Sequence, residues 1–357
     1  MRSFRVCACV IALAATVTIG SAAADPIRKL RMVLPHPNIA VGEEVFLYAV
    51  PKRLGYFKDE GVELDVTTSA GSVAAGQILV TGGADVAPIL AEAILGIREQ
   101  GGTPVAFYSL KRNNGFTVGV LPGSKITSLD DVSGKTIGFA SVSSGANKML
   151  AEQLRMDGKS PDYNALSLGT GPGVITAIRN GDVDALMLWD AVYALYENKG
   201  LILNHYEIPL QDKVAGYTMT ATEATLSNEK KAISGFCRAI AKGLHFTMTN
   251  PEAALQIFYE EYPSTMQADK DMKTNIAQGV NIMNKWLDRA QKGVAYGEKT
   301  GLQDASRWQF TQELYTKFGQ LKGTTDVNKA FTNDYFEACN DFDRAAVAAQ
   351  AKAYVLK

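Results

Sequence analysis

The sequence predicts an α/β protein made of two similar units, followed by a helical C-terminal third. The chain has 357 residues, more than a single hydrophobic core usually supports, so two lobes are expected. Short apolar runs alternate with stretches of helical periodicity, and this alternation starts twice, which is typical of βαβ units around a parallel sheet. After Ser227 the pattern becomes almost entirely helical.

The composition is that of a globular protein without a strong net charge. Hydrophobic residues make up 46% of the chain and charged residues 20%, which excludes the disordered class. The 36 Lys and Arg residues are balanced by 37 Asp and Glu residues, which excludes a protein that coats nucleic acid through bulk positive charge. With 3 histidines in the chain, extensive histidine chemistry is not expected.

The first 24 residues have the organisation of a signal peptide. Arg2 and Arg5 precede an apolar run from Val6 to Gly20, and small residues up to Ala24 follow, so cleavage is expected after Ala24. The apolar run of about 15 residues is shorter than the roughly 20 that a membrane-spanning helix needs. The mature protein is therefore expected to be periplasmic.

The first α/β unit follows directly after the signal peptide. Gly55 and the pair Gly82–Gly83 mark the ends of two of its helices. Strands are expected at 30–34, 62–66, 85–87 and 105–110, and helices at 45–54, 73–80 and 89–100.

The second unit repeats the alternation and leads into the helical third. Segments near 112–118 and 216–224 are interpreted as two crossings that form a paired hinge. In each unit one stretch, Gly82–Ala87 and Asn180–Ala185, links a helix to a short buried strand, so one pattern is used twice. Strands are expected at 116–121, 136–140, 165–168, 184–188 and 217–222, and helices at 145–157, 174–180, 191–199, 230–249 and 251–262.

Several segments in order resemble the nitrate/sulfonate/taurine and pyrimidine-precursor type of periplasmic solute-binding proteins, the NMT1-like group. These segments are Leu54–Leu64, Gly82–Ala87, Leu129–Gly138, Ile178–Ala185 and Asn250–Ala254. The resemblance implies a type-II periplasmic-binding-protein fold, with two α/β lobes, two hinge crossings and a ligand cleft between the lobes. Lobe I would then comprise 25–116 and 217–357, with the helical third packed on it, and lobe II would comprise 117–216.

The ligand site is expected beyond the carboxyl ends of the strands, where α/β sheets bind ligands. Small, polar and turn residues follow the strands at 35–38, 69–72, 88–89, 141–145, 169–171 and 189–190. The candidate ligand-binding residues are His36, Asn38, Gly71, Ser72, Pro88, Ile89, Ser143, Ser144, Gly145, Trp189, Asp190 and Tyr217.

The roles of these residues have plain structural alternatives. Ser143, Ser144 and Gly145 precede a helix whose N-terminus suits an anion, but a serine there also caps its own helix. Trp189 offers a flat surface for stacking, or else it is a core residue. Asp190 offers an acceptor for an amino group of the ligand, or else it caps the helix that follows. Lys111 and Arg112 are interpreted as a solvated basic pair.

Two cysteines remain after the signal peptide, Cys237 and Cys339. An oxidising compartment permits a disulfide between them, whereas two buried thiols are the alternative. Neither Cys-x-x-Cys nor His-Glu-x-x-His occurs, so no metal is expected, and no P-loop or dinucleotide fingerprint is found, so no cofactor is expected.

The leading hypothesis is a monomeric, non-enzymatic binding protein. It would capture an aminopyrimidine, an aromatic acid or a sulfonate by lobe closure and deliver it to an inner-membrane ABC permease and its ATPase, with no role for nucleic acid. The alternative is an exported enzyme on the same fold, dehydratase-like or forming a pyrimidine precursor. His36 and Asp190 are its candidate acid–base residues.

Overall fold

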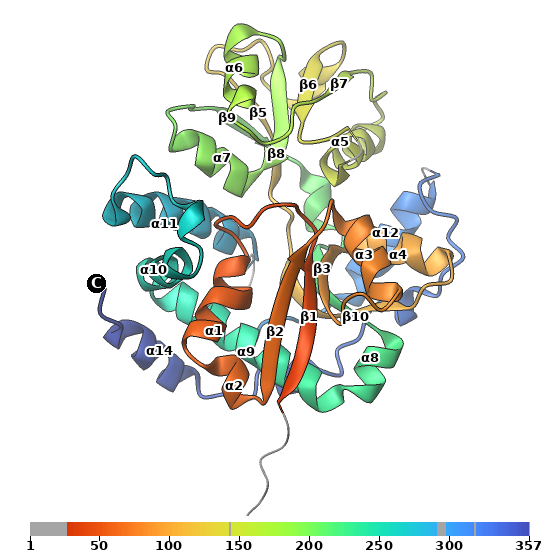
Figure 1. The fold of residues 1–357 in the computed structure, drawn as a ribbon. Coiled ribbons are helices and arrows are strands. Elements are labelled where there is room, and N and C mark those ends of the chain that lie inside the picture. Colours follow the sequence, from red (N-terminus) through yellow and green to blue (C-terminus); the bar gives the residue numbers. More distant parts are fainter. Residues whose placement is uncertain (1–26, 143, 291–297, 318, 357) are drawn as a thin grey trace, which may run out of the picture.

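The computed structural model describes residues 27–142, 144–290, 298–317 and 319–356. The chain forms two α/β lobes, one above the other in Figure 1. Lobe I, the lower one, contains strands β1 to β4 and β10, and lobe II contains β5 to β9. This arrangement confirms the predicted fold class. The predicted signal peptide lies outside the described residues.

Lobe I is built on two short sheets that a single bridge joins. β1 pairs with β2 in parallel, and β10 lies antiparallel between β3 and β4. A parallel bridge between Met32 and Val86 connects the two sheets, so the strands lie in the order β2-β1-β3-β10-β4. The strands are β1 (Arg28–Leu34), β2 (Val62–Thr68), β3 (Ala87–Leu90), β4 (Pro104–Lys111) and β10 (Tyr217–Thr222).

Lobe II repeats this strand order. Its sheet runs β7-β6-β8-β5-β9, with β6 parallel to β7 and β8 and with β5 antiparallel to β8 and β9. In both lobes the antiparallel strand is the one that arrives from the other lobe. The strands are β5 (Phe116–Val120), β6 (Thr136–Phe139), β7 (Asn164–Ser167), β8 (Ala185–Trp189) and β9 (Asn204–Glu207).

The repeated sequence pattern, Gly82–Ala87 and Asn180–Ala185, places an aspartate at the same point of both sheets. Asp85, before β3, accepts a hydrogen bond from the backbone amide of Arg31 in β1 at 2.8 Å. Asp184, before β8, accepts one from the backbone amide of Thr136 in β6, also at 2.8 Å. Each aspartate thereby fixes the strand that follows it beside its neighbour in the sheet, β3 beside β1 in lobe I and β8 beside β6 in lobe II.

Helices flank the sheets of both lobes, as the alternation of strands and helices predicts. The helix expected at 45–54 begins as a π-helical turn, Val45–Ala49, and β3 extends to Leu90, so the next helix begins at Ala91 rather than at 89. The helices of this part are α1 (Val50–Arg53), α2 (Tyr56–Asp59), α3 (Ser72–Val80), α4 (Ala91–Glu99), α5 (Gly145–Met156), α6 (Gly173–Asn180) and α7 (Asp190–Glu197).

The C-terminal third is helical and contributes most of the lobe I core. Phe236, Phe246 and Phe258, on α9 and α10, are fully buried in one cluster with β1 and the segment around Phe46. Its helices are α8 (Glu223–Asn228), α9 (Lys230–Thr249), α10 (Pro251–Glu261), α11 (Met272–Ala290), α12 (Ala305–Lys317), α13 (Phe336–Cys339) and α14 (Arg344–Ala353).

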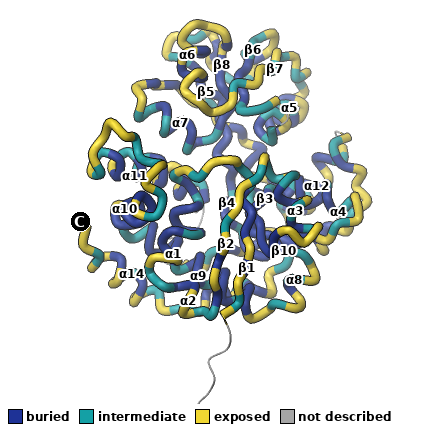
Figure 2. Tube along the Cα trace, in the orientation of Figure 1, coloured by how far each residue is buried: buried dark blue, intermediate teal, exposed yellow. Residues whose placement is uncertain are grey.

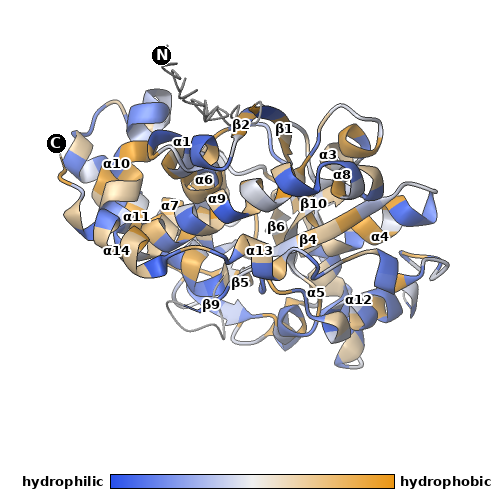
Figure 3. Cartoon of the chain, turned by 90° about the horizontal axis from the view of Figure 1, so that it is seen from below, coloured by the Kyte–Doolittle hydropathy of each residue, from blue (hydrophilic) through white to orange (hydrophobic). Residues whose placement is uncertain are grey.

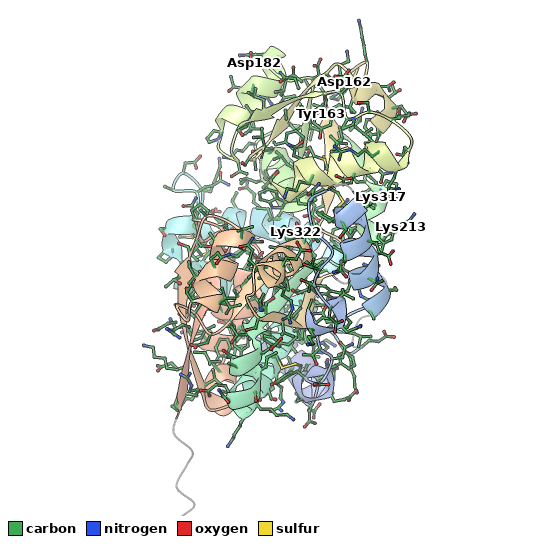
Figure 4. All side chains as sticks on the ribbon, turned by 90° about the vertical axis from the view of Figure 1, so that its right-hand side faces the viewer. Asp162, Tyr163, Asp182, Lys213, Lys317 and Lys322 are labelled. Atoms are coloured by element: carbon green, nitrogen blue, oxygen red, sulfur yellow. A yellow bond between two sulfur atoms is a disulfide. The ribbon has the colours of Figure 1, made fainter. Side chains whose placement is uncertain are left out.

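Parts of this helical third also contact lobe II, beyond the packing on lobe I that the resemblance implies. Asn198, after α7, donates to the backbone oxygen of Gln278 on α11 at 3.1 Å. On the other side of the molecule α12 rises beside α5, with Lys317 at its upper end in Figure 4. Gln320 there donates to Glu152 of α5 at 2.8 Å.

The central strands form the interior of both lobes, whereas the edge strands β7 and β9 are largely exposed. Figure 2 shows buried residues along the sheets and exposed residues over the outer helices and loops. Along β4, which is largely hydrophobic in Figure 3, every residue except Ser109 is buried. Among the described residues, no helix combines the length and apolar character needed to cross a membrane.

The two crossings between the lobes are tied side by side. The first runs from Lys111 to Phe116 and the second from Glu207 to Tyr217. Asn113 donates to Asp212 at 2.7 Å, and Gln211 exchanges two hydrogen bonds with the backbone of Phe116, at 2.7 and 2.6 Å. Any movement of one lobe relative to the other must therefore bend these two crossings together.

Cys237 and Cys339 are joined by a disulfide that links α9 to α13. Both residues are fully buried in the lobe I core. The bond connects residues 102 positions apart, and the chain-entropy account assigns a loop of that length about 4–5 kcal/mol of stabilisation.

We predict that the exported, oxidised protein has no titratable thiol under denaturing conditions. A Cys237→Ala/Cys339→Ala variant is expected to lose about 2–5 kcal/mol of unfolding free energy in urea titrations. Two titratable thiols in denatured protein from the periplasm would contradict the bond.

Candidate functional site

The strand ends of the two lobes meet at the edge where the crossings run. β10 begins at this edge, so β3 and β4, which run antiparallel to it, end there. β5 begins at the same edge, so β8 ends there, and β6 and β7 run parallel to β8 and end there too. Since ligands of α/β sheets bind beyond the carboxyl ends of strands, this edge is the candidate site.

On the lobe I side, the loop after β1 folds back onto the helix that follows it. His36 Nε2 lies 3.4 Å from Glu43 Oε1 and 3.6 Å from Glu44 Oε1. The Tyr217 hydroxyl, at the start of β10, donates to Glu43 Oε1 at 2.9 Å. The side chains of Glu43 and Glu44 are 12% and 4% exposed, and that of His36 is 32% exposed.

The charges of this cluster depend on one another. Burial lowers the pKa of His36, but the hydrogen bond and charge of Glu43 outweigh it and raise that pKa to about 9. Burial raises the pKa of Glu43, but His36 lowers it to about 2. Burial and the charge of Glu43 raise the pKa of Glu44 to about 8. Glu43 is therefore the carboxylate that pairs with the imidazolium, whereas Glu44 keeps its proton at neutral pH.

A buried ion pair spans the two lobes beside the crossings. Lys111, the last residue of β4, places Nζ 3.1 Å from Asp190 Oδ1, and their side chains are 5% and 7% exposed. Arg289 of α11 lies 3.8 Å from the other carboxylate oxygen. Burial raises the pKa of Asp190, and the charge of Lys111 opposes that rise.

This pair corrects one interpretation made from the sequence and bears on a second. Lys111 is not solvated, because it is buried against Asp190. Asp190 accepts from Lys111 and from the amide of Ala191 at 2.8 Å, so its oxygens already have donors. Gly115 of the first crossing has φ 74°, and a Cβ on it would lie 2.4 Å from Asp190 Oδ2. Only glycine permits this approach.

The N-terminus of α5 also faces a protein carboxylate. A Cβ added to Gly145 would lie 3.1 Å from Glu92 Oε1 and 3.5 Å from Leu90 Cδ1, both of lobe I. Glu92 thus stands beside the place where the sequence predicts an anionic ligand group. Burial raises the pKa of this carboxyl.

Ser144 does not cap α5 through its side chain, although the sequence predicts a capping serine. It stands at the N-cap position without a side-chain capping hydrogen bond. Its Oγ is buried and has no hydrogen-bond partner among the described residues. Ser143, the neighbouring candidate, lies outside the described residues.

The remaining candidates divide between the edge and the strands behind it. Trp189 is half-buried at the end of β8. Asn38 is exposed, and its backbone oxygen accepts from His36 Nδ1 at 2.9 Å. Gly71 is the N-cap of α3, and Ser72 Oγ accepts from the amide of Leu90 at 3.3 Å.

Pro88 and Ile89 do not stand at the end of their strand. They are buried inside β3, where Pro88 pairs with Met219 and Ile89 with Thr218 of β10. The strand instead ends at the half-buried Leu90. The sequence prediction ended β3 at 87, which moved the expected strand end by three residues.

The sequence prediction missed Glu43, Glu44, Glu92 and Arg289. A signal existed for the first two: they precede Val45–Val50, a helical stretch that is apolar almost throughout and therefore buried on most sides. No local signal identifies Glu92 or Arg289, because their partners come from the other lobe.

Comparisons with known proteins agree with this architecture. A family model described as NMT1/THI5 like matches residues 44–254. The riboflavin-binding protein RibY of Chloroflexus aurantiacus is 26% identical over 124 residues, 34% of this chain and 33% of RibY. The match therefore spans a third of that relative's length.

Solved structures extend the similarity over most of the chain. The periplasmic aliphatic sulphonate binding protein SsuA from Escherichia coli has a TM-score of 0.63 and 14% identity, over 85% of this chain and 91% of SsuA. The periplasmic nitrate-binding protein NrtA from Synechocystis has a TM-score of 0.60 and 12% identity, over 92% and 99%. At these identities the likeness shows the fold alone.

We predict that Asp190→Asn lowers the unfolding free energy by about 3–5 kcal/mol, since it leaves Lys111 buried without its carboxylate. Asp65→Asn is the matched control, because the Lys29–Asp65 pair is 57% and 53% exposed and its loss is expected to cost less than about 1 kcal/mol. Urea denaturation of both variants provides the comparison. Equal, small losses would contradict a buried interlobe pair.

Proposed function

Because this chain belongs to the NMT1/THI5-like family, we propose that it is the solute-binding component of an ABC importer. In this proposal the exported protein captures a small organic molecule between its lobes and presents it to a membrane permease. The signal-peptide pattern at residues 2–24 supports export, and the fold that it shares with periplasmic binding proteins supports the role.

The observation that carries the proposal is the meeting of strand ends from both lobes at the tied crossings. A solute bound there contacts both lobes at once. It therefore stabilises the closed arrangement over the open one by its differential affinity. The hydrogen bonds between Asn113 and Asp212 and between Gln211 and Phe116 provide the common hinge.

Two lobe II residues are proposed as the principal ligand contacts. Trp189 is half-buried at the end of β8, where its ring offers a flat surface for stacking. The buried Oγ of Ser144 has no partner in the described part of the chain. A ligand group beside it would satisfy that hydroxyl, whose unmet hydrogen bond otherwise costs free energy.

Among the solute classes expected from the sequence, flat nitrogen heterocycles such as aminopyrimidines fit best. A sulfonate or carboxylate head at the N-terminus of α5 would approach the Glu92 carboxyl, which stands beside Gly145. Asp190 is already engaged by Lys111 and Ala191, so we do not propose it as the main ligand acceptor. The stacking surface of Trp189 remains and favours an aromatic ring.

The alternative of an exported enzyme loses one of its two candidate groups. Asp190 is held in the ion pair with Lys111, so it is not poised to exchange protons with a substrate. His36 remains beside Glu43 and Glu44. Mass spectrometry of a bound solute after incubation separates the two functions, since a binding protein returns it chemically unchanged.

We predict that a thermal-shift screen over aminopyrimidines, flavins, aromatic acids, alkylsulfonates and nitrate finds its largest shift with a flat nitrogen heterocycle. At 100-fold above the dissociation constant, a bound solute stabilises the protein by about 2.7 kcal/mol. A largest shift with nitrate or an alkylsulfonate would contradict the proposed class and leave the binding function intact.

Trp189→Ala is predicted to weaken the affinity for that solute by roughly 1–3 kcal/mol, the scale of a buried aromatic contact. Trp189→Phe, which keeps a ring, should retain most of the affinity. Calorimetric titration gives the affinity, and melting of the solute-free protein gives the stability. A lower melting temperature with unchanged affinity would assign Trp189 to the core.

Ser144→Ala is predicted to weaken solute binding by about 1–2 kcal/mol while the solute-free protein melts unchanged or slightly higher. The reason is that Ser144 makes no side-chain capping bond to lose. The exposed Ser133 provides the matched control as Ser133→Ala. A clear fall in melting temperature for Ser144→Ala alone would indicate capping instead of ligand contact.

A further inference from the structure

We propose that His36, Glu43 and Glu44 form a binding site for one divalent transition-metal ion of the zinc class. One nitrogen and two carboxylate oxygens from these residues lie within 4.8 Å of one another. The inference goes beyond the proposed solute binding and does not depend on it.

Two of the three distances between the donor atoms match those around such an ion. Zinc binds histidine nitrogen and carboxylate oxygen at about 2.0–2.2 Å, so tetrahedral ligand atoms are roughly 3.3–3.5 Å apart. His36 Nε2 is 3.4 Å from Glu43 Oε1 and 3.6 Å from Glu44 Oε1. Three protein ligands leave at least one position open for water or a solute group.

Groups outside the cluster hold the ligands in orientation. The backbone oxygen of Asn38 lies 2.9 Å from His36 Nδ1, which places the donor hydrogen on Nδ1 and turns Nε2 toward the two carboxylates. The Tyr217 hydroxyl donates to Glu43 Oε1. Metal-bound histidines and carboxylates usually have outer partners of this kind, a carbonyl for the imidazole and a donor for the carboxylate.

The cluster can balance the charge of a divalent cation. Within the described residues, the ion pairs of Glu43 and Glu44 are with His36 alone, so two largely buried carboxyl groups share one imidazole. A divalent ion that displaces the protons from His36 Nε2 and Glu44 would be balanced by the two carboxylates, as metal ligands bind in their deprotonated forms.

Sequence spacing alone does not reveal this site. His36 precedes Glu43 and Glu44 by seven and eight residues, which matches no helical zinc motif. The loop after β1 returns to the π-helical turn at Val45–Ala49, and this return brings the three side chains together. Turns of that type are frequent at functional sites.

The test uses the full mature protein without an affinity tag, stripped with a chelator and titrated with Zn²⁺ and with Co²⁺. We expect about one Zn²⁺ per chain by elemental analysis, a rise in melting temperature, and Co²⁺ absorption bands of a low-coordinate nitrogen and oxygen site. His36→Ala and Glu43→Gln are expected to lower the Zn²⁺ affinity at least tenfold.

Two variants serve as matched controls, His205→Gln and the exposed Glu63→Gln, and both should keep wild-type affinity. Each variant is first checked for an unchanged melting temperature without metal. If a variant fails this check, the Co²⁺ spectrum of the wild-type protein shows whether nitrogen and oxygen ligands bind the ion.

Less than a tenth of an equivalent of Zn²⁺, or equal affinity in site and control variants, would overturn the proposal. Solute binding is measured separately in the presence of chelator. If the protein binds its solute but no metal, the metal site is contradicted and the proposed solute-binding function stands. If it binds metal but no solute, the solute-binding function is contradicted and the metal site stands.

Discussion

The architecture depends on the two crossings being held together. Each crossing leaves one sheet and becomes the antiparallel strand of the other lobe, so both sheets must direct their parallel strands toward the same edge. The hydrogen bonds of Asn113 and Gln211 fix the crossings to each other, and the Lys111–Asp190 pair closes the contact beside them. The position of the candidate site follows from this constraint.

At the edge where the strand ends of the two lobes meet, acidic and basic side chains have different surroundings. Carboxyl groups from Glu43, Glu44 and Glu92 stand close to the places where a ligand or ion would lie, whereas Lys111 and Arg289 are committed to Asp190 and Glu207. These carboxyl groups supply no positive charge to an anion, and they can accept hydrogen bonds from a ligand. The proposed preference for a flat heterocycle over an anion rests on this distribution.

Local signals in the sequence predicted the fold well, because strand and helix periodicity depend on neighbours along the chain. The edge strand β9 was missed since Asn204–Glu207 has no apolar alternation. The site was predicted only in part. The positions of Trp189 and His36 after strands can be predicted from the local sequence. The residues that contact Asp190 and Gly145 come from the other lobe, and no periodicity along the chain predicts such contacts.

The central claim is that the lobes close on a solute about the tied crossings. Spin labels at Val73→Cys on lobe I and Met156→Cys on lobe II, both exposed positions, allow the distance between the lobes to be measured by pulsed electron resonance with the native disulfide intact. The account predicts a distance distribution that narrows and shifts when the solute found in the screen is added at saturation. A solute that binds at one site per chain and leaves the distribution unchanged would contradict it.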